Sequence, residues 1–163
     1  MARKCFYSFH YDDDNWRVST VKNIGAIEGQ QLIAANDFEE LKRQGDKAVS
    51  DWIAKNMAGR STVIVLIGSN TAARKWVNHE IKYGFENGKA LVGIHIHRLL
   101  DRQGNPSKKG ANPFETFTVG AQKTPLTNWA KTYDPGGSDS KAVYETIKNN
   151  IESWVEEAIK LRA

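Results

Sequence analysis

A glutamate one helical turn after a tryptophan carries the clearest chemical signal in this sequence. In the segment 71–86, apolar and small residues recur at helical spacing and predict a helix with one buried face. Glu80 lies about 70° from the centre of that face and follows Trp76 by one turn. A carboxylate at the margin of a buried stripe can act strongly on a developing positive charge, because its surroundings have a low dielectric constant. An edge glutamate paired with Lys75 or Lys82 is the alternative, and the pattern by itself favours that alternative.

Other combinations of reactive residues give weaker signals. His95 and His97 share one face of a predicted strand, and such a pair could bind a metal ion, but no convincing third ligand is identifiable. We therefore expect packing or hydrogen bonding for both rings and no metal site. The single cysteine, Cys5, excludes a disulfide framework and a cysteine-based zinc site within the chain. The glycine-rich phosphate-binding motifs are missing, which argues against conventional Rossmann hydride transfer and P-loop hydrolysis.

The elements that must position Glu80 alternate between strands and helices. The uninterrupted β-branched run at 62–67 predicts a strand buried on both faces, as in a parallel sheet. Strands are predicted at 5–9, 31–35, 62–67, 90–97 and 126–132, and helices at 15–24, 46–57, 71–86 and 141–161. This order predicts an α/β, flavodoxin-like domain with a mostly parallel sheet of about five strands and helices on both faces.

The chain is expected to form one domain over residues 1–163. A loop is predicted at 36–45, the segment 98–121 reads as a surface excursion, and 138–162 reads as a C-terminal helix. In an open α/β sheet, ligands bind beyond the carboxyl ends of the strands. The candidate surface therefore includes the segments 9–12 and 68–70.

Composition restricts the class of protein. The net charge of +4 over 163 residues is too small to imply nucleic-acid binding, and the 40% hydrophobic content is ordinary for a globular domain. No stretch of 18 apolar residues exists, so we expect a cytoplasmic protein without a membrane span. Of the five tryptophans, Trp52 and Trp154 lie on apolar helical stripes, whereas Trp16 and Trp129 have no predicted role.

Several segments resemble the TIR-like domain family, and most closely the TIR-like (ThsB-type) subunit of the Thoeris antiphage defence system. The likeness is carried by the segment 6–12, by the segment 65–69 followed by Trp76 and Glu80, and by the segment 93–96. It covers about residues 3 to 115. The loop after the second predicted strand differs from the loop common in TIR domains.

The resemblance implies a flavodoxin-like fold and an NAD-consuming activity. Active members of the family cleave the bond between nicotinamide and ribose and make a signalling nucleotide from the ADP-ribose part. The family's catalytic glutamate maps onto Glu80. The family's substrate pocket implies substrate-binding roles for Phe9, His10, Tyr11, Asp12, Ser69 and Trp76.

The resemblance also implies partners. NAD is expected as substrate, with no resident cofactor, and the product is a cyclic ADP-ribose-type nucleotide or a conjugate. A chain of 163 residues leaves no room for a fused effector, so the messenger would activate a separate effector protein after a phage-derived trigger. Head-to-tail TIR-like contacts imply a homo-oligomer, and neither a membrane nor a nucleic acid is expected. Two alternatives remain open: a non-enzymatic interaction scaffold, and a flavodoxin-like nucleotide or flavin binder.

Overall fold

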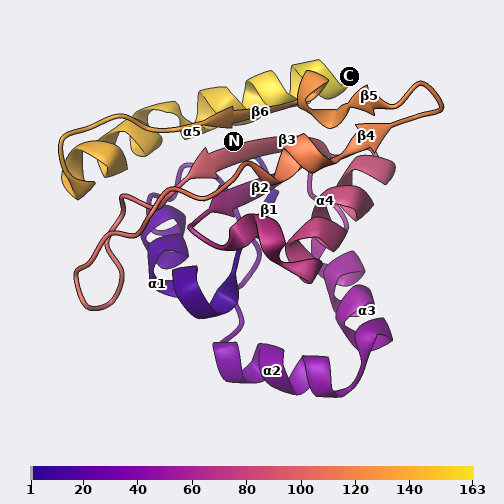
Figure 1. The fold of residues 1–163 in the computed structure, drawn as a ribbon, viewed down its shortest axis with the longest axis horizontal. Coiled ribbons are helices and arrows are strands. Elements are labelled where there is room, and N and C mark those ends of the chain that lie inside the picture. Colours follow the sequence, from indigo (N-terminus) through magenta and orange to yellow (C-terminus); the bar gives the residue numbers. More distant parts are fainter. Residues whose placement is uncertain (1) are drawn as a thin grey trace.

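A four-stranded parallel sheet forms the centre of the molecule in the computed structural model. The structure describes residues 2–163, and within that range all side chains except those of Asp12 and Ala35. The sheet contains β1 (Cys5–Ser8), β2 (Thr62–Ile67), β3 (Ala90–His95) and β6 (Ala130–Tyr133), paired in that order (Figure 1). Every residue of β1, β2 and β3 is buried, as expected for parallel strands covered on both faces.

Helices cover both faces of this sheet. On one face α1 (Tyr11–Lys22) contacts α5 (Ser140–Arg162), which packs on β2 and β3. On the other face α3 (Asp46–Met57) packs on β1, and α4 (Lys75–Glu86) packs on all of the first three strands. Figure 1 shows α2 (Ala35–Arg43) farther from the sheet than the other helices. The predicted α/β, flavodoxin-like arrangement is confirmed.

The strand predicted at 31–35 is wrong. Glu28 pairs with the outer edge of the sheet by a single parallel bridge to Lys4. Two residues later, the side-chain amide of Gln30 pairs with β1 in the way that the backbone of a neighbouring strand would. The Tyr7 N–H donates to Gln30 Oε1 (2.8 Å), and Gln30 Nε2 donates to the Tyr7 carbonyl (2.9 Å). Because a side chain satisfies the edge of β1, the backbone leaves the sheet after residue 30. The sheet therefore has four strands rather than about five.

Three further segments differ from the predictions. The segment 36–45, predicted as a loop, contains most of α2, because Phe38 is buried and gives this polar helix an apolar contact. The predicted helix 71–86 is interrupted: a 3-10 turn at Thr71–Ala73 is followed by Arg74 in an extended conformation, and α4 begins at Lys75. The predicted helix 15–24 instead begins four residues earlier, as α1.

The excursion over 98–121 is anchored rather than loose. Arg17 of α1 donates to the carbonyls of Leu99 (2.7 Å) and Asn105 (2.9 Å). Gly110 lies directly against the backbone of Gly68, where a side chain would collide with the Gly68 carbonyl. After Gly110 the chain forms a 3-10 turn at Pro113–Thr116 and the small β4–β5 hairpin (Thr118–Val119 and Thr124–Pro125). Another 3-10 turn at Leu126–Asn128 leads into β6, which begins four residues after the predicted 126.

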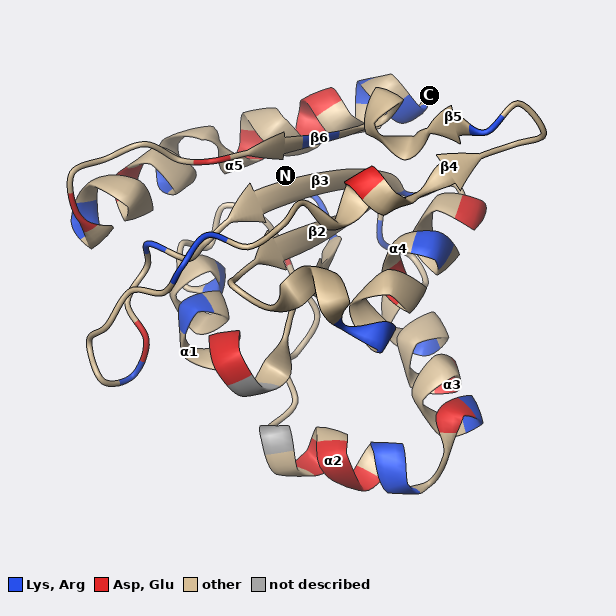
Figure 2. Cartoon of the chain, viewed as in Figure 1, with Lys and Arg blue, Asp and Glu red and all other residues tan. Residues whose placement is uncertain are grey.

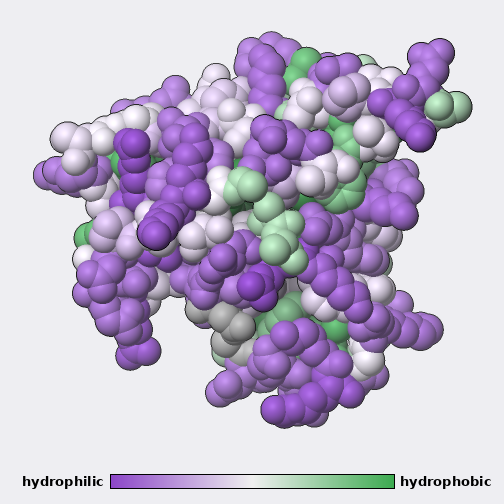
Figure 3. Space-filling view, viewed as in Figure 1, coloured by the Kyte–Doolittle hydropathy of each residue, from purple (hydrophilic) through white to green (hydrophobic). Residues whose placement is uncertain are grey.

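The C-terminal helix predicted at 138–162 is present as α5. Asp139 caps it, because its side chain accepts a hydrogen bond from the Ala142 N–H at 2.9 Å. Within residues 2–163, no helix combines the length and the apolar character needed to cross a membrane. Figure 3 shows a mainly hydrophilic face, with apolar colour between α2 and the rest of the molecule.

Candidate functional site

The carboxyl ends of β1 and β2 diverge at the point where a ligand site is expected. The chain after β1 enters α1 on one face of the sheet, and the chain after β2 leads to α4 on the other. A cavity of about 260 Å³ opens here, between the end of β1, α2 and the first turn of α4. Its aromatic walls come from Phe9, Tyr11, Phe38 and Trp76. The apolar area beside α2 in Figure 3 lies over the same elements.

Glu80 lines this cavity with a buried carboxyl group. The residue is 4% exposed, and the Ser8 hydroxyl donates to Glu80 Oε1 at 2.6 Å. Burial raises the pKa of Glu80 to about 8, although the Ser8 hydrogen bond acts in the opposite direction. In the described part of the chain Glu80 forms no ion pair, and Lys75 bonds instead to Asp46 at 2.6 Å. The alternative of an edge glutamate paired with Lys75 is therefore wrong.

The interrupted helix explains how Glu80 reaches the end of β1. Because α4 begins at Lys75, Glu80 lies in its second turn rather than deep in a longer helix. The side chain then meets Ser8, the last residue of β1. Sequence reasoning missed the role of Ser8, since no pattern connects residues 72 positions apart. A hydroxyl inside the apolar and aromatic run 5–9 was the one available signal.

Three of the four aromatic walls pack against one another, whereas the Trp76 ring contacts His79 of its own helix. The Tyr11 ring lies parallel to Phe38, with centroids 4.3 Å apart and planes at 11°, and it also contacts Phe9 at 4.4 Å. Burial and the nearby carboxyl of Glu80 raise the pKa of Tyr11 far above its usual range. Such flat, dry walls suit a planar aromatic ring system and exclude water.

His10 and Asp13 connect the ends of the two strands beside the cavity. His10 Nδ1 lies 3.1 Å from Asp13 Oδ2, and the Asn70 amide donates to the same oxygen at 2.9 Å. The Asn70 hydrogen bond is the main reason that the pKa of Asp13 is lowered. His10 lines the cavity and Asn70 follows β2, so this bridge holds the two strand ends together.

The rim of the cavity is mainly basic. Lys42, Arg74 and Lys75 line it together with one acidic residue, Glu39. In the cartoon of Figure 2, basic residues colour part of α2 and the start of α4, the two helices that contribute these residues. A rim of this composition favours a ligand that carries phosphate groups next to an aromatic part.

The structure separates one predicted site residue from the others. Ser69 lines a second cavity, of about 660 Å³, and not the cavity around Glu80. Tyr11 lines both cavities and forms the wall between them. Phe9, His10, Tyr11, Trp76 and Glu80 all line the first cavity, and the side chain of Asp12 lies outside the described residues.

Among the described residues, no group of three or more His, Cys, Asp or Glu side chains is placed to hold a metal ion. His95 and His97 are both buried, with ring centroids 5.8 Å apart. Burial is the main cause that lowers the pKa of both rings.

Comparison with known proteins gives two matches. The family model described as "Thoeris protein ThsB, TIR-like domain" matches residues 6–101. A protein from Bacillus cereus (strain MSX-D12), named "Putative cyclic ADP-D-ribose synthase ThsB1", is 38% identical over 120 residues. The alignment covers 71% of this chain and 62% of that relative, so the chain spans less than two thirds of the relative's length.

Proposed function

This chain belongs to the TIR-like domain family of the Thoeris protein ThsB, and we propose that it cleaves the nicotinamide–ribose bond of NAD. NAD is then a substrate rather than a resident cofactor. The observation that carries the proposal is the buried carboxyl of Glu80 in an aromatic cavity, held by Ser8. The name of the Bacillus cereus relative, a putative cyclic ADP-D-ribose synthase, supports NAD as the substrate.

The chemistry requires a negative charge near the ribose. When the bond between the ribose C1′ and the pyridinium nitrogen breaks, its electron pair stays on nicotinamide, which leaves as a neutral molecule. The positive charge passes to the ribose, which becomes oxocarbenium-like. The leaving group needs no proton, so the ionised form of Glu80 is the active one: it stabilises the cation and accepts hydrogen bonds from ribose hydroxyls. The positive charge of bound NAD favours that ionised form.

The walls of the cavity determine the outcome of the reaction. Phe9, Tyr11, Phe38 and Trp76 bury the reacting carbon and limit the access of water, so a nucleophile other than water can capture the ribose. An internal atom of the ADP-ribose part gives a cyclic nucleotide, and another small molecule gives a conjugate. In the proposed defence role, a phage-derived trigger activates the chain through TIR-like contacts between copies, and the product activates a separate effector protein.

Nicotinamide release tests the proposal directly. The full chain is incubated with NAD, with and without a lysate of phage-infected cells, and the small molecules are followed by liquid chromatography and mass spectrometry. We expect nicotinamide and an ADP-ribose-derived nucleotide from the wild type and from Glu86→Gln, a control at an exposed glutamate of the same helix. Glu80→Gln should release both about 10²–10³-fold more slowly. Equal release by Glu80→Gln would overturn the assignment of Glu80, and no release by any protein under either condition would favour a scaffold role.

A further inference from the structure

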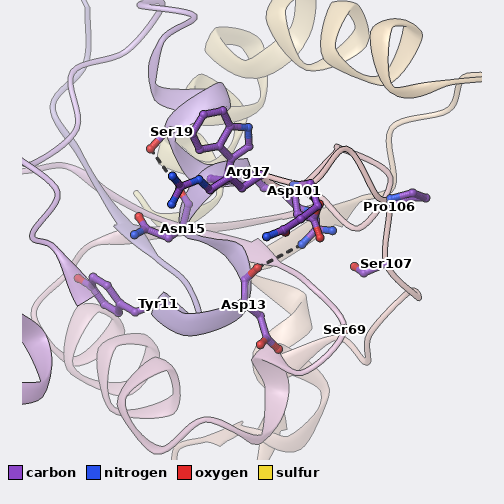
Figure 4. Close-up of a pocket in the computed structure, with 12 residues that line it drawn as sticks. Tyr11, Asp13, Asn15, Arg17, Ser19, Ser69, Asp101, Pro106 and Ser107 are labelled. Carbon is purple, nitrogen blue, oxygen red and sulfur yellow. Dashed lines mark hydrogen bonds between the residues drawn. The ribbon is translucent and has the colours of Figure 1, made fainter. Parts of the chain in front are cut away.

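The second cavity lies next to the first, and nothing above gives it a ligand. We propose that it holds a purine ribonucleoside, the adenosine part of the dinucleotide, with the pyrophosphate between the two cavities at Arg74. The inference rests on the proposed function, because it deals with the part of the same substrate that lies beyond the reacting ribose. Figure 4 shows Tyr11 at one end of this cavity and Asp101, Pro106 and Ser107 at the other.

The sizes of the two cavities require a division of the substrate. Pockets that enclose a drug-sized ligand have volumes of about 300–1,000 Å³. The cavity around Glu80, at about 260 Å³, is smaller than this range and encloses only part of a dinucleotide. The second cavity has about 660 Å³, and Tyr11 is common to both. A ligand that passes over Tyr11 can occupy both.

Trp16 supplies an unusual surface for a base. It lines the second cavity and is 54% exposed, which makes it one of two large hydrophobic residues with high exposure in the described chain. The other tryptophans at 52, 76, 129 and 154 are less exposed and contact other aromatic rings. An exposed indole beside a cavity offers a face on which a purine can stack.

The polar groups of the cavity match a ribose. Asp13 and Asp101 both line it, and their carboxylates can accept hydrogen bonds from ribose hydroxyls. Both are already held in place: Asp13 by Asn70 at 2.9 Å, and Asp101 Oδ1 by the N–H groups of Gln103 and Asn105, each at 2.9 Å. Arg17 and Arg102 also line the cavity, and Arg17 is already bonded to Asp14 and to the carbonyls of Leu99 and Asn105.

Arg74 stands at the boundary between the two cavities. It lines the cavity around Glu80, and its charge contributes to the lowered pKa of Asp13, which lines the other cavity. Its side chain is exposed, and Arg74 Nε donates one long hydrogen bond, of 3.4 Å, to the Asn70 carbonyl. A guanidinium in this place can bind a pyrophosphate through two parallel hydrogen bonds.

The far wall of the cavity is preorganised. Arg17 of α1 donates to the carbonyls of Leu99 and Asn105, and these two hydrogen bonds join the 98–107 loop to α1. An ion pair with Asp14 of the same helix, at 3.0 Å, holds the Arg17 guanidinium in place. The Ser107 N–H also donates to the His97 carbonyl at 2.8 Å. A fixed wall reduces the entropy that a bound nucleoside would otherwise cost.

Calorimetric titration with ADP tests the inference without any turnover. ADP carries the adenosine and the pyrophosphate but lacks the reacting ribose and nicotinamide. We expect ADP to bind the wild type and Glu80→Gln equally, since Glu80 lies in the other cavity. Trp16→Ala should weaken binding about tenfold, Trp16→Phe should restore most of it, and Arg74→Ala should weaken it about tenfold. Arg3→Ala, at an exposed arginine before the amino end of β1, is the matched control and should have no effect.

The two proposals fail in different ways. No ADP binding, or equal binding by Trp16→Ala, Arg74→Ala and the wild type, overturns the nucleoside site even if nicotinamide release is intact. ADP binding with this pattern, together with no nicotinamide release under any condition, overturns the reaction and leaves the nucleoside site standing.

Discussion

Two buried carboxyl groups, Glu80 and Asp14, differ in what they contact. Burial raises the pKa of both. Asp14 forms an ion pair with Arg17 at 3.0 Å, and both side chains are nearly inaccessible. Glu80 has a hydroxyl group, that of Ser8, as its hydrogen-bond donor. A buried acid with a full cationic partner stabilises structure, whereas a buried acid that lacks one in a cavity is available to a cationic substrate.

The same difference separates the two cavities. Around Glu80, three of the aromatic walls pack against one another, and the carboxyl group has no cationic partner among the described residues. Around the second cavity the Asp14–Arg17 pair fixes a polar loop, and the lining side chains remain available for hydrogen bonds. The chain therefore uses one buried carboxyl to perform chemistry and the other to support a wall.

The largest expected effect concerns the supporting pair. Arg17→Met leaves Asp14 buried without a partner and releases the carbonyls of Leu99 and Asn105, so the free energy of unfolding should fall by about 3–5 kcal/mol. Chemical denaturation measures the change, and hydrogen exchange should rise at residues 99–105. Arg43→Met, which breaks an exposed pair with Glu40, should change stability by about 0.5 kcal/mol or less. Similar losses in both variants would contradict the role assigned to Arg17.

Glu80 should make the protein less stable as pH rises. Its pKa is about 8 in the folded chain and near 4.5 when exposed, so the folded state holds the extra proton between these values. The favourable contribution is complete below about pH 4.5 and is lost as pH rises through 8. Glu80→Gln should therefore match the wild type near pH 4.5 and exceed its unfolding free energy by roughly 2–4 kcal/mol at pH 8.5.

Denaturation of both proteins across this pH range gives the comparison. Glu86→Gln, at an exposed position of α4, should follow the wild type at every pH. A wild-type curve parallel to that of Glu80→Gln would mean that the carboxyl is ionised in the folded state.

Ser8 should have a smaller effect, confined to the pH dependence of catalysis. Its hydrogen bond favours the ionised form of Glu80, so Ser8→Ala should raise the pKa of Glu80 further. The rise of kcat/KM with pH should then move to higher pH, with a loss of about tenfold at pH 7. Ser61→Ala, just before the amino end of β2 and so at the other end of the strands, is the control. An unchanged profile in Ser8→Ala would show that Ser8 only packs against Glu80.

The sequence predicted the elements that are buried by their own pattern. The runs at 62–67 and 90–95 and the stripe of α5 are apolar enough to be identified alone. The strand predicted at 31–35 failed because the side chain of Gln30 replaces backbone pairing, a contact across 23 residues. Helix α2 was missed because its main buried side chain, Phe38, is held by Tyr11 from a distant part of the chain.

The candidate site was also predictable only where a local pattern showed it. The helical period placed Glu80 beside the core, and the resemblance to TIR-like domains gave it a role. No local pattern could show that α4 restarts after an extended Arg74, that Ser8 meets Glu80, or that Ser69 lines a different cavity from Trp76. Each of these depends on contacts between segments far apart in sequence.

Steady-state nicotinamide release at varied NAD concentration tests the division between the two cavities most directly. With triggered protein, Glu80→Gln should lower kcat by about 10²–10³-fold and leave KM nearly unchanged, because Glu80 acts on the charge that develops during the reaction. Trp16→Ala should raise KM about tenfold and leave kcat unchanged, because a stacked base is bound equally before and during the reaction. A wild-type kcat in Glu80→Gln would contradict the account.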